Sequence, residues 1–163
     1  MPLTIDIAIE DGGWDRHPYL ERWTREAVDA CLLETDAAPP DGSELSLLLC
    51  GDARMRGLNR DFRGLDKPTN VLSFPAPPQG PGPRPLGDIA IAYETVVREA
   101  EEERKSLHDH YAHMVAHGLL HILGYDHEAD GEAEAMEALE RRILKRLGIA
   151  DPYAANDRDT GQH

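Results

Sequence analysis

Three histidines in the segment HGLLHILGYDH, residues 117–127, have the spacing of a metal site. His117 and His121 are four residues apart, so on a helix their side chains leave the same face one turn apart. Gly124 can adopt the left-handed conformation that ends a helix and reverses the chain, which would bring His127 back as a third ligand. Three neutral imidazoles suit zinc or another late first-row ion, and a fourth position stays open for water or substrate. The segment therefore predicts a catalytic metal centre.

The same segment matches the metzincin protease pattern H-E-x-x-H-x-x-G-x-x-H except at one position. Gly118 stands where those proteases have the glutamate that takes a proton from water at the zinc. Because glycine has no side chain, the sequence predicts a metzincin-like helix and turn without the general base of a protease. His113, one turn before His117, is expected to support a ligand or the fold rather than to bind the ion.

The elements that must position these histidines follow from hydrophobic periodicity. Strands are expected at 3–9, 44–50, 70–75 and 87–93, and helices at 18–34, 94–104, 107–123 and 130–147. A further helix, with Asp52 as its N-cap, carries Met55, Leu58 and Phe62 as an apolar stripe. This order predicts a single α+β domain over residues 1–150, with a small mixed sheet of about four strands, one of them antiparallel. The proline-rich stretch 76–86 is expected to be a loop, and 151–163 a flexible tail.

Composition narrows the functional classes. The chain of 163 residues has a formal net charge of −14, which argues against a protein that coats nucleic acid by bulk charge. Acidic residues concentrate at 98–104 and 128–140, whereas basic residues predominate between Arg54 and Lys67. Nothing resembles a membrane span or a secretory signal, and Cys31 and Cys50 lie in apolar surroundings typical of buried thiols in a reducing compartment.

A second informative stretch, LNRDFRGLDKPTNVLSFP at residues 58–75, combines turn residues with cations. Turn chemistry explains Asp66, Pro68 and Thr69, but not the arginines. A guanidinium near a metal would suit a phosphodiester, which it can bind through two hydrogen bonds. Arg60, Arg63, Lys67 and Asn70 are therefore candidate contacts for such a substrate.

Together, HGLLHILGYDH, FRGLDKPTNVLSFP and GDIAI make the chain resemble the YbeY family of bacterial endoribonucleases over roughly residues 44–148. The resemblance implies one zinc ion held by His117, His121 and His127, and a functionally important arginine at Arg63. It implies metal-dependent cleavage of single-stranded RNA in rRNA maturation, at the 3′ end of 16S rRNA, and in ribosome quality control. The small ribosomal subunit or ribosomal proteins would be partners, and the location would be cytoplasmic.

Two other functions remain open at this point. One is a metallohydrolase that acts on a substrate other than RNA, and the other is a ribosome-assembly factor whose metal is structural. The sequence also leaves open whether water or the 2′-hydroxyl of the substrate is the nucleophile, and it identifies no general base.

Overall fold

The computed structural model describes residues 3–10, 13–77, 80–125 and 130–153. These residues form, in chain order, β1 (Leu3–Ile9), a short 3-10 helix (Trp14–Arg16), α1 (Leu20–Glu34), β2 (Ser43–Cys50), α2 (Asp52–Arg63), β3 (Val71–Pro75), β4 (Pro85–Ala92), α3 (Tyr93–Glu102), α4 (Leu107–Ile122) and α5 (Asp130–Arg146). Strands and helices therefore mix in one α+β arrangement, as the sequence predicts.

The four strands make one mixed sheet in the order β1-β2-β4-β3. The β1–β2 and β2–β4 pairings are parallel, and β3 runs antiparallel to β4. The central strands β2 and β4 are rich in leucine, isoleucine and alanine, as strands covered on both faces usually are. β3 is an edge strand, so one side of its backbone is turned away from the sheet.

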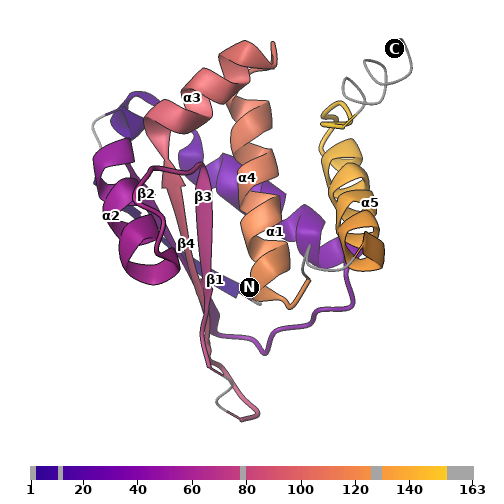
Figure 1. Cartoon of the computed structure of the whole chain (residues 1–163). Helices are drawn as coiled ribbons and strands as arrows, with labels where there is room; N and C mark the ends of the chain where they lie inside the picture. Colours follow the sequence, from indigo (N-terminus) through magenta and orange to yellow (C-terminus); the bar gives the residue numbers. More distant parts are fainter. Residues whose placement is uncertain (1–2, 11–12, 78–79, 126–129, 154–163) are drawn as a thin grey trace.

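Helices cover both faces of this sheet (Figure 1). α2 packs on one face over a small apolar cluster that includes Met55, Leu72 and Ala90. α1, α4 and α5 lie on the other face, where the main core holds fully buried residues such as Tyr111, Leu119 and Met136. α4 thus lies between the sheet and α5, which places a histidine-bearing helix beside the edge strand β3 (Figure 1).

Two details of the predicted elements are wrong. The N-cap of α2 is Gly51, not Asp52. The Asp52 carboxylate instead accepts hydrogen bonds from the Thr95 N–H at 3.2 Å and the Thr95 hydroxyl at 2.7 Å, which tie α2 to α3. β4 also begins earlier than residue 87, because a bulge lets Pro85 pair with β2 before the regular ladder resumes at Gly87.

Both cysteines are buried, as predicted, and burial raises the pKa of the Cys31 thiol to about 12. Within the described part of the chain, every helix is too short or too polar to cross a membrane.

Candidate active site

α4 places two of the predicted ligands. The Ser106 hydroxyl caps its start by accepting from the Asp109 N–H, and its end has the hydrogen-bond pattern that a left-handed glycine allows. Gly124 has a φ of 104°, its N–H donates to the His121 carbonyl, and the Tyr125 N–H reaches back to the Leu120 carbonyl. The left-handed conformation predicted for Gly124 is therefore confirmed, whereas the return of the chain to the site stays a prediction. His127 lies outside the described residues.

His117 and His121 face each other across one turn of α4. Their Nε2 atoms are 3.2 Å apart, and their ring centroids are 4.7 Å apart. Two nitrogens on a tetrahedral zinc ion, each about 2.05 Å from the metal, are about 3.3 Å apart. The separation of the two Nε2 atoms therefore suits two ligands of one metal ion.

A carboxylate fixes which nitrogen of His117 faces outward. The Nδ1 atom of His117 lies 2.6 Å from Oε1 of Glu140 on α5. A carboxylate that keeps its charge only accepts hydrogen bonds, so Nδ1 carries the proton and Nε2 keeps its lone pair. An imidazole oriented in this way, with its other nitrogen on a carboxylate, is the usual state of a metal-binding histidine.

Glu140 itself is fully buried, with an exposed fraction of 0%. Burial alone would raise the pKa of Glu140, but hydrogen bonds from His113 and His117 outweigh burial and hold that pKa well below its usual range. His113 Nε2 lies 3.1 Å from Oε2 of Glu140, and the Tyr153 hydroxyl donates to the same oxygen. Burial lowers the pKa of His113, so its ring favours the neutral form despite this carboxylate. A cation at His117 and His121 would balance the buried charge of Glu140.

Sequence reasoning missed Glu140 and Tyr153. A signal was present for Glu140, because it lies on α5 between Met136 and Ile143, four residues after one and three before the other. Both neighbours are fully buried, so the glutamate falls on the apolar side of its helix, where an ionised residue needs a partner. The predicted supporting role of His113 agrees with its contact with Glu140.

The packing of α4 explains why Gly118 cannot be the glutamate of a protease. A Cβ atom at Gly118 would lie 2.9 Å from Cγ2 of Ile89 and 3.2 Å from the Ser73 hydroxyl oxygen. That hydroxyl also donates to the Gly118 carbonyl at 3.0 Å. α4 therefore approaches the sheet too closely at this residue for a longer side chain, and the site has no general base there.

The two histidines open onto a cavity of about 830 Å³, here called the histidine cavity. Its lining includes Phe62, Arg63, Ser73, Phe74, His117 and His121. Arg63 is the last residue of α2, and Gly64 ends that helix with a φ of 72°. Helix α2 thus brings a guanidinium, and α4 brings two imidazoles, to one cavity across the edge of β3.

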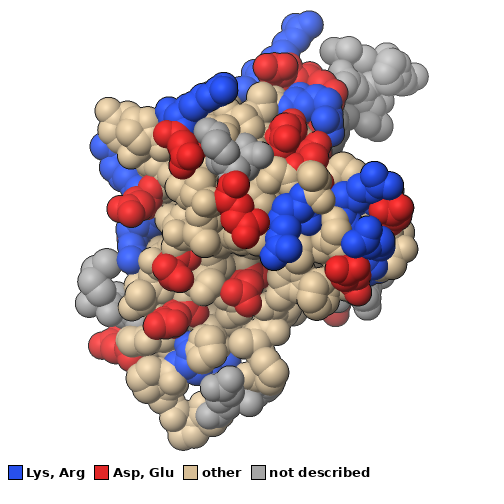
Figure 2. All heavy atoms as spheres, turned by 90° about the vertical axis from the view of Figure 1, so that its left-hand side faces the viewer, with Lys and Arg blue, Asp and Glu red and all other residues tan. Residues whose placement is uncertain are grey.

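The other arginines of α2 differ from Arg63. Arg56 is held by Asp66 through two hydrogen bonds of 2.7 and 3.0 Å, and Arg60 lies 3.2 Å from Asp61. Among the described residues, no hydrogen bond or ion pair is found for the Arg63 guanidinium. Figure 2 shows the face that carries α2, where acidic and basic side chains are interspersed rather than gathered into a basic surface.

The three predicted substrate contacts other than Arg63 do not line the histidine cavity. Arg60 and Lys67 are exposed nearby, and the Lys67 carbonyl accepts from the Asn59 side chain at 2.9 Å. Asn70 is engaged within the fold, because its Nδ2 donates to Glu99 at 3.1 Å and its Oδ1 accepts from the Val71 N–H at 2.7 Å.

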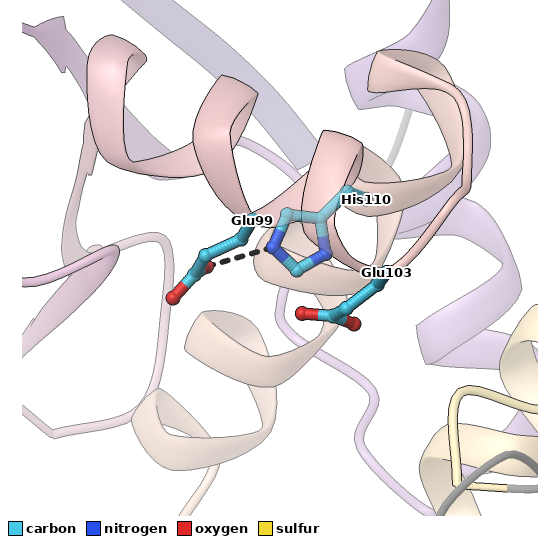
Figure 3. Close-up of side chains that lie close together, drawn as sticks. All are labelled: Glu99, Glu103 and His110. Carbon is cyan, nitrogen blue, oxygen red and sulfur yellow. Dashed lines mark hydrogen bonds and ion pairs between the residues drawn. The ribbon is translucent and has the colours of Figure 1, made fainter.

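A second group, on α4 and at the C-terminal end of α3, could also hold a metal ion by distance (Figure 3). Ligand atoms of Glu99, Glu103 and His110 lie within 4.8 Å of one another. His110 Nε2 is 2.8 Å from Glu99, and Figure 3 shows its other ring nitrogen on the side of Glu103. Glu103 already forms an ion pair of 2.8 Å with Lys105, so a cation here would compete with an ammonium group.

An α+β domain that brings two imidazoles and a guanidinium to one cavity is typical of hydrolases that act on phosphate esters with the help of a metal. The model of the endoribonuclease YbeY family matches residues 8–148, and this chain belongs to that family. Curated relatives named endoribonuclease YbeY include those of Nitrobacter winogradskyi, 60% identical over 98% of this chain and 86% of the relative, and Chelativorans sp., 54% identical over 93% and 94%. The relative from Azorhizobium caulinodans is 51% identical over 93% of this chain and 97% of its own length.

Among solved structures, the solution structure of TM1509 from Thermotoga maritima has a TM-score of 0.55 at 23% identity. The aligned residues cover 88% of this chain and 91% of the TM1509 chain. That likeness concerns the fold alone, and it agrees with the α+β arrangement.

Proposed function

We propose that this chain is a metal-dependent endoribonuclease that cleaves single-stranded RNA in the histidine cavity. The observation that carries the proposal is the convergence of Arg63 from α2 with His117 and His121 from α4 on one cavity. Membership of the endoribonuclease YbeY family supports RNA as the substrate. The biological task would be the maturation of the 3′ end of 16S rRNA together with ribosome quality control. Ribosomal proteins or the small subunit would be partners in the cytoplasm.

The ion would be a single zinc held by His117, His121 and His127. Imidazole ligands suit zinc as well as other late first-row ions, and the hydrogen bond from His117 to Glu140 prepares Nε2 as a ligand. When bound, the ion supplies positive charge that polarises a phosphate oxygen or makes water a better nucleophile. Gly118 excludes a protease mechanism that depends on a glutamate at that position.

Residues of the chain would bind the phosphate and stabilise its charge during the reaction. Arg63 would bind two phosphate oxygens and stabilise the charge that develops on them. The backbone of β3 would help, because odd-numbered residues of this strand direct their N–H groups away from β4. This follows from the antiparallel ladder, in which Ala92 donates to Asn70 and Ala76 donates to Leu86. The Ser73 N–H therefore points toward the free edge that lines the cavity.

The overall acidity of the chain does not exclude RNA as the substrate. Arg60 and Asp61 are both more than half exposed, and exposed ion pairs contribute little, about 0–1 kcal/mol. A phosphate can therefore replace Asp61 as the partner of Arg60. Because few cations take part, cleavage should depend on local contacts near the cavity and not on a wide basic surface.

The test combines metal analysis with cleavage of a single-stranded fragment from the 3′ end of 16S rRNA. The wild type should hold one zinc ion and cleave. His121→Ala should lose both, whereas Arg63→Ala should keep the metal and lose cleavage. Arg22→Ala is the matched control, because Arg22 is an exposed arginine on α1 that pairs with Glu26. If every preparation cleaves alike, the activity is a contaminant and a ribosome-assembly factor with a structural metal becomes the better interpretation.

A further inference from the structure

An exposed aromatic pair lies next to the histidine cavity. The Phe62 side chain on the last turn of α2 is 67% exposed, and its ring packs edge-on against Phe74 of β3 at a centroid distance of 5.1 Å. Both rings line the histidine cavity. Phe62 directly precedes Arg63, so a phosphate at that guanidinium would place the adjoining nucleoside within reach of the aromatic pair.

The same two rings also line a second, separate cavity of about 360 Å³. Its other walls include Leu48, Leu58, Ala90 and Asp88. The β3–β4 register pairs Phe74 directly with Asp88, so both side chains lie on the α2 face of the sheet. Asp88 is the one ionisable residue among the described residues that line this cavity, and the cavity volume falls within the range of cavities that hold small organic ligands.

We propose that this second cavity binds the base of a nucleotide adjacent to the cleaved phosphate, with a preference for guanine. The proposal rests on the proposed endoribonuclease function. Phe62 and Phe74 supply a stacking surface, which suits any base. Two cavities that share this aromatic wall let one RNA strand cross the edge of β3, with its phosphate near the histidines and its base beneath α2.

Asp88 gives the cavity its selectivity. An ionised carboxylate has two oxygens, and both only accept hydrogen bonds. Guanine presents two adjacent donors on its Watson–Crick edge, the ring N–H and the exocyclic amino group, and can therefore satisfy both oxygens. Cytosine and adenine offer one amino group beside an acceptor, and uracil offers one N–H between two carbonyl oxygens. The expected order is guanine first, cytosine and adenine next, and uracil last.

The experiment uses the full chain loaded with zinc and four single-stranded RNA oligonucleotides that differ only in the base beside the mapped cleavage position. The wild type should cleave the guanine substrate with a kcat/KM roughly tenfold above that of the uracil substrate. Asp88→Asn should remove most of this preference, because an amide offers only one acceptor. Phe62→Ala should raise KM by about tenfold for all four substrates, with a smaller effect on kcat, because stacking acts on every base.

Two variants serve as matched controls. Leu33→Ala removes a side chain on α1 that is 68% exposed, nearly the same as Phe62, and Asp29→Asn neutralises an exposed aspartate on the same helix. Both should behave as the wild type. Equal cleavage of the four substrates by the wild type, or no effect of Phe62→Ala, would reject the base site while leaving the endoribonuclease intact.

Absence of cleavage by the wild type would instead reject the proposed function. The base site is then decided by fluorescence anisotropy with the same oligonucleotides, where equal affinities of the wild type and Phe62→Ala would reject it. In that case an apolar side chain of a partner protein would be the remaining occupant of the cavity.

Discussion

Among the histidine–carboxylate contacts on α4, those of His110 and His117 differ most, because only His117 of these two residues lines the histidine cavity. His110 and His117 are two turns apart, and each bonds to a glutamate of a neighbouring helix, at 2.8 Å to Glu99 of α3 and at 2.6 Å to Glu140 of α5. His117 uses Nδ1 for this bond and presents Nε2 to His121. His110 uses Nε2, and its Nδ1 is buried without a hydrogen-bond partner among the described residues.

This difference distinguishes the candidate metal site at His117 from the His110–Glu99 pair, which we call the structural brace. The His117 side chain is 22% exposed and lines the histidine cavity, whereas the His110 side chain is 3% exposed. Through Asn70, the His110–Glu99 pair also holds the start of β3. We therefore expect His117 to bind the metal and His110 to support the fold, because only the second nitrogen of His117 reaches the histidine cavity.

The largest expected effect comes from His117→Ala compared with His110→Ala. His117→Ala should lose the metal and lower kcat/KM for RNA cleavage by at least about a thousandfold, because a metal contributes several kcal/mol to such reactions. His110→Ala should keep the metal and stay within about tenfold of the wild type. It should lose about 1–3 kcal/mol of stability instead, because Glu99 loses a buried partner. Kinetics, metal analysis and urea unfolding measure the three quantities. If the His110→Ala variant folds but fails to cleave, His110 takes part in the reaction and the distinction between the two histidines is wrong.

Removal of the metal should show which of the two groups, at His117 or at His110, binds it. Zinc at about a thousand times its dissociation constant should raise the free energy of unfolding by about 4 kcal/mol, since the unfolded chain lacks the assembled site. We expect one ion per chain, and Glu103→Gln should leave both stoichiometry and stabilisation unchanged. Thermal unfolding with and without a chelator measures the stabilisation. A second ion that disappears in Glu103→Gln would assign metal binding to Glu99, Glu103 and His110.

Glu140→Gln should weaken the metal site less than loss of a ligand. The amide of the variant can still accept a hydrogen bond from His117. It no longer balances the charge of the ion, and it no longer raises the basicity of the His117 imidazole. The affinity for zinc should therefore fall about 10–100-fold. Glu99→Gln makes the matching change at the other pair and should leave zinc affinity unaltered. Competition with a chromogenic chelator gives both affinities. Equal losses in the two variants would mean that the carboxylates act through the fold and not through His117.

Periodicity and turn chemistry were sufficient to predict the fold and part of the site. His117 and His121 follow from helical spacing, and the left-handed glycine at Gly124 follows from the need to end that helix. The start of β4 was missed because a bulge at Leu86 moves Pro85 into the ladder, and a bulge leaves no periodic signal. Asp52 was mistaken for a cap because its actual partner, Thr95, is distant in sequence.

Contacts between helices were the part that the sequence alone could not supply. Glu99 and Glu140 reach their histidines, and the Tyr153 hydroxyl reaches Glu140, only when α3, α5 and the chain after α5 pack against α4. The substrate contact expected of Asn70 stays a prediction, and the hydrogen bond from its amide to Glu99 could not be foreseen from the sequence. The role of His127 and the domain boundary at residue 150 stay predictions.

The smallest expected effect is a pH dependence of the free energy of unfolding, which arises from Glu99 in the structural brace. Burial would raise the pKa of Glu99, but hydrogen bonds from His110 and Asn70, with the nearby charge of Arg98, lower that pKa below its usual range. A carboxyl whose pKa is lowered in the folded state contributes stability above the unfolded pKa, and that contribution is lost as the pH falls through the folded value. The stability difference between the wild type and Glu99→Gln should therefore be constant above about pH 5.5 and shrink below about pH 4.5. Urea unfolding from pH 3.5 to 7 measures it, with Glu101→Gln, an exposed change on the same helix, as the control. If the stability difference between the wild type and Glu99→Gln does not vary with pH, Glu99 acts as a neutral hydrogen-bond acceptor. The charge of Glu99 would then contribute nothing to the stability of the structural brace.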